Sequence, residues 1–324
     1  MSIDGRLPQA AEDRDLGSQG AGPALLYDPR LVEEGVFLAL GEHPEAQDFQ
    51  RQRDRLYEMA DPEEREHAFH ELHRAWFRRL GLADGITAAL AEQPLLASAI
   101  KTCVIACAPG KRQEEADLLV RHEEDLQDRE RRTLRLLISP ESLLDPPALR
   151  NFLRHELFHI RDMVDPRFSY EPELPVAEAG PAHDRLLRDR YRILWDMTID
   201  GRMLRRAWAP EAVRARRLDE FARAFPMFGA QTLQVFGSFF DHEPHTHGEL
   251  VAMARDPRAV LGNSRGAQQP GSRCPLCHFP SYAFEPRPES LGATALGWIT
   301  REFPDWKPSR GLCLQCADLY RARR

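Results

Sequence analysis

Long hydrophobic runs are missing from the sequence, and their absence bears on where the protein resides. No stretch of the 324 residues approaches the roughly 20 apolar residues that a membrane helix needs. The first residues, Met1 to Arg6, also lack the apolar core of a secretory signal peptide. We therefore expect a cytoplasmic protein that has no membrane partner.

Lysine is scarce, since it occurs only as Lys101, Lys111 and Lys307, and arginine supplies almost all the basic charge. Acidic residues outnumber basic ones, which gives a net charge of −7. This balance disfavours a nucleic-acid partner, although a local basic patch would still permit one. An apolar content of 42% and a charged content of 29% are typical of an ordinary folded protein.

Cysteine is also sparse, but four of the six cysteines form two C-x-x-C pairs near the C-terminus. In a reducing compartment such pairs usually hold metal rather than form disulfides. Two pairs can close a tetrahedral structural zinc site, and a redox dithiol is the alternative. We expect a linker and a zinc ribbon over residues 261–324; such modules contact a protein partner, bind nucleic acid or lock a chain terminus. The predicted ligands are Cys274, Cys277, Cys313 and Cys316, and the predicted small core is Trp298, Phe303 and Trp306.

One amphipathic helix is predicted over residues 145–164. Asp145 suits the N-cap and Pro146 suits the first helical position. Apolar residues recur at three- and four-residue steps, which predicts one buried stripe. The stripe comprises Leu149, Phe152, Leu153, Leu157, Ile160 and Val164.

The same helix carries an H-E-x-x-H motif. His155 and His159 are four residues apart, so their rings project from one side of the helix. Glu156 follows the first histidine and is placed to act as a general base. The motif predicts a catalytic zinc site with two histidine ligands.

The order of the other predicted elements indicates an α+β fold. We expect a disordered tail over residues 1–24, a helical region over 25–112 and a zincin-like catalytic domain over 113–260. Strands predicted at 116–122 and 132–139 would form a small antiparallel sheet before the H-E-x-x-H helix. The edge of the second strand would hold an extended peptide over the metal.

A second histidine-rich segment lies in the charged helix predicted over residues 62–80. His67, His70 and His73 recur at three-residue steps. An ideal helix drifts by about 60° over three residues, so the outer two rings diverge and chelate poorly. A solvated or packed helix face is the preferred interpretation.

The third ligand of the catalytic zinc is expected on the helix predicted over residues 182–208. Asp196 and Asp200 fall on its apolar stripe, where a carboxylate is costly unless it is paired or bound to metal. One Asp would bind zinc and the other would orient a ligand histidine. An Asp–Arg bridge between helices is the alternative, and Glu178 and His183 are outside candidates.

This order of strand, H-E-x-x-H helix, loop and second ligand-bearing helix resembles gluzincin-type metallopeptidases. In that group the second helix commonly carries Glu-x-x-x-Asp, whereas this chain has Asp196 and Asp200. It also resembles uncharacterised bacterial metallopeptidases with Trp-Asn-x-Ala-x-Asp, of which Trp195 and Asp200 match. The resemblance covers roughly residues 113–260, and it favours Asp200 as ligand because both patterns share it.

The function that this resemblance implies is zinc-dependent hydrolysis of a peptide or protein substrate. Glu156 would act as general base on a water bound to zinc, with one zinc catalytic and one structural. His245 or His247 would donate to the oxyanion, and an exposed polar turn is the alternative for both. Two rivals remain: a non-catalytic adaptor with a partner-binding zinc ribbon, and a DNA-associated protease, which would need a third histidine ligand.

Overall fold

The computed structural model describes residues 22–121, 127–175, 181–242, 245–257 and 271–323. The chain divides into two compact units, one ending at Pro166 and the other beginning at Arg167. Each unit is described by itself. Residues 1–21 of the predicted tail, most of the predicted linker and Glu178 lie outside the described residues.

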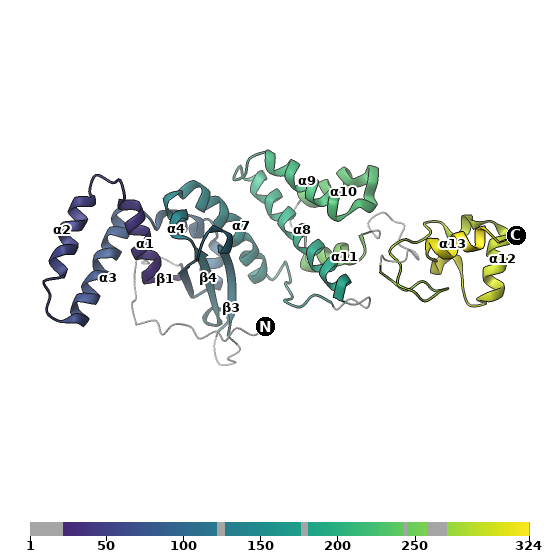
Figure 1. The fold of residues 1–324 in the computed structure, drawn as a ribbon, viewed down its shortest axis with the longest axis horizontal. Helices are drawn as coiled ribbons and strands as arrows, with labels where there is room; N and C mark the ends of the chain where they lie inside the picture. Colours follow the sequence, from purple (N-terminus) through teal and green to yellow (C-terminus); the bar gives the residue numbers. More distant parts are fainter. Residues whose placement is uncertain (1–21, 122–126, 176–180, 243–244, 258–270, 324) are drawn as a thin grey trace. The chain divides into compact units, whose positions relative to one another are not determined.

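The first unit contains both helices and strands, with five consecutive helices between its first two strands (Figure 1). Each of the longer helices α1, α3 and α7 begins at an aspartate whose side chain accepts a hydrogen bond from the backbone of the first turn. The elements are β1 (Ala24–Tyr27), α1 (Pro29–Leu40), α2 (Ala46–Leu56), α3 (Pro62–Arg79), α4 (Asp84–Ala91), α5 (Pro94–Ala99), β2 (Thr102–Cys107), β3 (Glu115–Val120), α6 (Asp128–Arg131), β4 (Arg132–Ile138) and α7 (Pro146–Val164).

The four strands form one mixed sheet in the order β1-β2-β4-β3. Strands β1 and β2 pair in parallel, as do β2 and β4, whereas β3 and β4 are antiparallel. The predicted hairpin is therefore confirmed, but the prediction of a purely antiparallel sheet is wrong. Parallel pairing arises because helices connect β1 to β2.

Strand β4, which precedes the H-E-x-x-H helix, lies inside the sheet. It is hydrogen-bonded to β2 on one side and to β3 on the other. A strand with two partners offers no free edge for an added peptide strand. The prediction that this strand binds substrate at its edge is therefore wrong.

The core of the first unit lies between the sheet and its helices. Helix α7 packs against α4, α5 and β3, and α2 runs beside α3 (Figure 1). The predicted stripe of α7 enters this core, with Phe152 only partly buried and the other five residues buried. Strand residues Ile105, Leu134 and Leu136 are fully buried in the same core.

In the described residues of the second unit the regular elements are helices, and two short antiparallel bridges hold its C-terminal segment. Helix α8 packs against α9, α10 and α11, and Phe221, Phe225 and Phe236 are fully buried there. The helices are α8 (Pro181–Arg205), α9 (Ala212–Ala224), α10 (Thr232–Phe240), α11 (His247–Arg255), α12 (Ala293–Glu302) and α13 (Leu314–Arg321). The long helix predicted over 182–208 is α8.

A small separate core holds the C-terminal segment together. Trp306 is buried in it beside Leu312 and Ile299, while Trp298 and Phe303 are partly buried against it. Across the described parts of the chain, every helix is too short or too polar to span a lipid bilayer.

Candidate metal centres

Two groups of side chains in the described residues have the ligand types that hold a metal ion. One is the set of four C-terminal cysteines, and the other is His155, His159 and Asp196. The histidines belong to the first unit and Asp196 belongs to the second.

The two histidines of α7 are oriented by a well-anchored helix. Their ring centroids lie 5.1 Å apart, as expected for residues one turn apart on one face. Both rings and Glu156 are partly exposed, whereas Leu153 and Leu157 on the inner face are fully buried. The imidazoles and the carboxylate therefore remain accessible on a helix whose other face is fixed in the core.

Glu92, which directly follows α4, ties α7 to its neighbours. Its carboxylate accepts hydrogen bonds from Arg154 Nε at 2.7 Å and from Arg150 Nε at 3.0 Å. The bond from Arg154, opposed by burial and supported by Arg150, holds the pKa of Glu92 below its usual range. Because Arg154 directly precedes His155, this ion pair restrains the helix at the motif.

The two aspartates of α8 have different surroundings. Asp200 is buried, with a side chain only 5% exposed, and its Oδ2 accepts from Arg217 Nε at 2.6 Å and from Arg216 Nη2 at 3.4 Å. Asp196 is partly exposed, and its Oδ2 lies 3.5 Å from Arg217 Nη1. The strong contact of Arg217 is thus with Asp200 and the weaker one is with Asp196.

Arg217 of α9 connects several carboxylates in the second unit. Its Nη1 also donates to Glu220 Oε2 at 2.6 Å. Burial opposes the charge of Arg217, but Asp200, Asp196 and Glu220 outweigh it and raise the pKa of the guanidinium. The Asp–Arg bridge between helices that the sequence offered as the alternative therefore exists: Arg217 of α9 pairs closely with Asp200 and more weakly with Asp196 of α8.

His247 is packed among aromatic side chains. Its Nδ1 lies 2.7 Å from Tyr191 Oη, and its ring packs edge-on against Phe168, Tyr170 and Tyr191. Burial lowers the pKa of His247, against an opposing effect of Glu171. A neutral ring that accepts the Tyr191 hydroxyl at Nδ1 carries its own proton on Nε2, and is thus a hydrogen-bond donor.

His245 has a structural environment. Its Nε2 donates to the Ser238 carbonyl at 3.0 Å, and its ring stacks on Phe239 with centroids 4.3 Å apart. Its Nδ1 lies 3.5 Å from the Glu249 carboxylate. Both ring nitrogens thus have local partners, which supports the interpretation as a polar turn for this residue.

His183 lies at the start of α8. It precedes Asp196 by about 20 Å of helix at 1.5 Å per residue, so the two residues are too far apart to share a metal ion. Within the described residues, the group that contains both motif histidines includes Asp196 and not His183, which makes His183 a poor candidate for the third ligand. Glu178 lies outside the described residues.

The four cysteine sulfurs converge on one point, with all Sγ atoms within 4.8 Å of one another. Sγ atoms of Cys274 and Cys316 lie 3.8 Å apart, much longer than the roughly 2.05 Å of a disulfide. Backbone N–H groups of Leu276 and Cys313 donate to the Cys274 sulfur. Burial opposes ionisation, but backbone N–H groups outweigh it and lower the pKa of Cys274 to about 7. This arrangement fits a tetrahedral metal ion.

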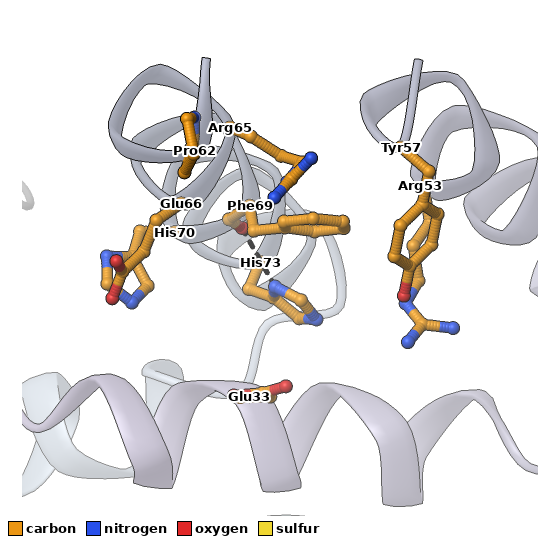
Figure 2. Close-up of a pocket in the computed structure, with 9 residues that line it drawn as sticks. All are labelled: Glu33, Arg53, Tyr57, Pro62, Arg65, Glu66, Phe69, His70 and His73. Carbon is orange, nitrogen blue, oxygen red and sulfur yellow. Dashed lines mark hydrogen bonds between the residues drawn. The ribbon is translucent and has the colours of Figure 1, made fainter. Parts of the chain in front are cut away.

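The three histidines of α3 do not converge. His67 and His70 are exposed, whereas His73 is buried and its Nδ1 donates to the Phe69 carbonyl at 2.8 Å (Figure 2). Within the described residues, the groups with metal-binding geometry include none of the three. The expected helix face, partly solvated and partly packed, is what the structure has.

Two important residues were not identified from the sequence. Arg217 lies on the helix after the aspartates, and Tyr191 lies one turn before Trp195 on α8. Neither belongs to a motif, because each acquires its partner only when helices pack. The signal available was weak: a buried aspartate requires a cation, and a histidine among aromatic residues is often hydrogen-bonded.

Comparison with known proteins gives no family assignment. No protein-family model matches the chain, and neither a curated protein nor a solved structure matches it. The resemblance to gluzincin-type peptidases therefore depends on the motif and on the groups of ligands described above.

Proposed function

We propose that the protein is a zinc-dependent peptidase whose metal is held by His155, His159 and Asp196. The observation that carries this proposal is the H-E-x-x-H motif on a capped, anchored helix, together with a carboxylate that completes a set of ligand types suited to zinc. Two imidazoles and one carboxylate leave a fourth position open, which is typical of catalytic rather than structural zinc. The substrate is a peptide or protein.

Asp196 is the better candidate for the third ligand, although the sequence favoured Asp200. Asp200 is buried against the guanidinium of Arg217, which neutralises its charge. Asp196 is partly exposed and has the weaker contact with Arg217. In this proposal Asp200 anchors Arg217, and Arg217 steadies Asp196 for the metal.

Zinc, when bound, would supply a Lewis acid that polarises the substrate carbonyl and acidifies a water molecule. Glu156, which neighbours His155 on the exposed side of α7, would take a proton from that water and pass it to the leaving amine. His247 is the better candidate for an oxyanion donor than His245, because Tyr191 Oη holds its ring at Nδ1, and with the Tyr191 hydroxyl as donor the proton of the neutral ring would lie on Nε2. His245 already donates to Ser238.

The second zinc would be structural and held by Cys274, Cys277, Cys313 and Cys316. Four thiolates close the tetrahedron and leave no position for substrate. The structural zinc would therefore take no part in the peptidase reaction. It predicts a total of about two zinc ions per chain.

The experiment that tests both sites measures zinc per chain by mass spectrometry. We expect about two zinc ions in the wild type, and about one in the His155→Ala/His159→Ala variant because zinc needs both imidazoles. The matched control is His67→Ala/His70→Ala, which removes two exposed histidines and should retain both ions. An unchanged zinc content in the motif variant would refute the catalytic site.

Activity is tested with a library of quenched fluorescent peptides. Glu156→Gln should keep both zinc ions but lose at least about 100-fold in rate, since it removes the general base. Glu64→Gln, an exposed change on α3, is the control. If the wild type binds two zinc ions and cleaves no peptide, the protein is better described as an adaptor with a peptidase-like core.

A further inference from the structure

A pocket of about 430 Å³ lies between α1, α2 and α3 of the first unit (Figure 2). None of the residues of the proposed metal sites line it. Its volume falls within the range of about 300–1,000 Å³ that is typical of small-molecule sites. The lining residues are Glu33, Arg53, Tyr57, Pro62, Arg65, Glu66, Phe69, His70 and His73.

His73 contributes a buried acceptor to this pocket. His73 is only 5% exposed, and Nδ1 must carry the proton because its partner, the Phe69 carbonyl, can only accept. Nε2 of the neutral ring is then an acceptor, and it is buried with no hydrogen-bond partner in the described residues. Figure 2 shows this nitrogen on the side of the ring that faces Arg53. Buried acceptors normally find a donor, which a ligand N–H would supply.

Charges of both signs line the pocket without neutralising one another. Glu33 and Glu66 line the pocket together with Arg53 and Arg65, yet within the described residues no ion pair joins any of the four to another. Figure 2 shows the Glu66 carboxylate beside His70, away from both guanidinium groups. Separated unlike charges are suited to a ligand that itself carries one charge of each sign.

Both arginines are held in position by other contacts. The Arg53 guanidinium lies 5.3 Å from the Phe37 ring centroid and 5.5 Å from that of Tyr57. Arg65 Nη1 donates to the Met59 carbonyl at 3.2 Å. These contacts restrict the side chains and leave guanidinium N–H groups available for a carboxylate.

Tyr57 and Phe69 give the pocket an apolar wall. Their ring centroids lie 5.1 Å apart in an edge-to-face arrangement. Figure 2 shows both rings facing the same space as Arg53 and Arg65. An apolar or aromatic group on the ligand would pack against this wall.

We propose that this pocket binds a dipolar ligand of the α-amino acid or short-peptide type that has an apolar side chain. Its ammonium group lies near Glu33 and donates to His73 Nε2. Its carboxylate binds Arg53 and Arg65, and its side chain packs on Tyr57 and Phe69. The proposal does not depend on zinc or on peptidase activity.

Calorimetric titration of the full chain with free L-phenylalanine tests the proposal. This probe has both charges and no peptide bond that a peptidase could cleave. We expect saturable binding that weakens about tenfold or more with N-acetyl-L-phenylalanine, which lacks the cation, and with L-phenylalaninamide, which lacks the anion. Equal binding of all three compounds, or no saturable binding up to about 20 mM, would overturn it.

Variants locate the binding in this pocket. Arg53→Gln should weaken phenylalanine binding about tenfold or more, because a charge-assisted contact is lost. Arg51→Gln is the matched control, since Arg51 lies on the same helix, is 69% exposed and does not line the pocket. Glu33→Gln repeats the test at an exposed residue if Arg53→Gln fails to fold. Wild-type affinity in a folded Arg53→Gln or Glu33→Gln variant would place the binding elsewhere and refute the proposal.

Discussion

Replacing Arg217 with methionine should lower the free energy of unfolding by about 3–5 kcal/mol, as expected when one partner of a buried ion pair is removed. The side chains of Arg217 and Asp200 are only 11% and 5% exposed, and their contact is 2.6 Å. Methionine preserves much of the apolar stem of arginine but removes the guanidinium. The Asp200 carboxylate then stays buried while it loses its closest cation.

Arg216 provides the matched control for this prediction. It contacts the same oxygen of Asp200, but at 3.4 Å and with a side chain that is 60% exposed. Arg216→Met should therefore cost no more than about 1 kcal/mol. Adding Asp200→Asn to Arg217→Met should recover part of the loss, because a neutral amide is less costly to bury than a carboxylate.

Urea denaturation of the full chain at pH 7 measures these differences. Far-UV circular dichroism and tryptophan fluorescence should be recorded together, because a chain with two compact units need not unfold in one transition. If Arg217→Met costs no more than Arg216→Met, the pair is not buried as described. The choice of Asp196 over Asp200 as the metal ligand would then lose its basis.

Three further predictions concern charge, pH and close packing. Glu92→Gln should lower the free energy of unfolding by about 2 kcal/mol at neutral pH. Because the pKa of Glu92 is lowered in the folded state, this stabilisation is present above about pH 4.5 and is lost as pH falls through the folded pKa. In urea titrations at acid pH, wild type and variant should therefore have the same stability. Burial lowers the pKa of His247, so this residue takes up a proton in the unfolded chain before it does so in the folded one. Wild-type stability should therefore decline as pH falls below about 6.5. A His247→Gln variant should lose less stability than the wild type between pH 7 and pH 5. Gly201→Ala should destabilise the protein by about 3 kcal/mol, because the new Cβ would lie 2.0 Å from the Phe240 carbonyl oxygen. Gly297→Ala, which has open space around the new Cβ, should stabilise the protein by about 0.5–1 kcal/mol. A similar melting temperature for both variants would contradict the close approach of α8 and α10.

The helix of the H-E-x-x-H motif was predictable because its signals are local. Asp145 caps it, Pro146 begins it, and the apolar spacing identifies the face that enters the core. The pairing of β3 with β4 was predictable for the same reason, since the two strands are near neighbours in sequence. Local chemistry also indicated the cysteine site, because two C-x-x-C pairs define the ligands by spacing alone.

Features that depend on distant partners were not predictable. The parallel pairing of β1 with β2 joins residues 24–27 to residues 102–105, and no local signal sets that orientation. Asp196 and Asp200 look alike in the sequence, and only the position of Arg217 on the next helix separates them. The same holds for His245 and His247, which differ only in whether Ser238 or Tyr191 is the partner.

The position of Cys313 links metal binding to folding in the C-terminal segment. This residue is both a proposed ligand and the N-cap of α13, where its sulfur accepts a hydrogen bond from the Cys316 backbone. Burial and the neighbouring Cys274 sulfur raise the pKa of Cys313, so a bound cation would be what stabilises its thiolate. The first turn of α13 and the metal site are thus assembled from the same atoms, and the segment has only a small apolar core of its own. If the four cysteines hold a metal ion, a chelator should unwind α13 as it removes the ion, and the folding of this segment would depend on the metal.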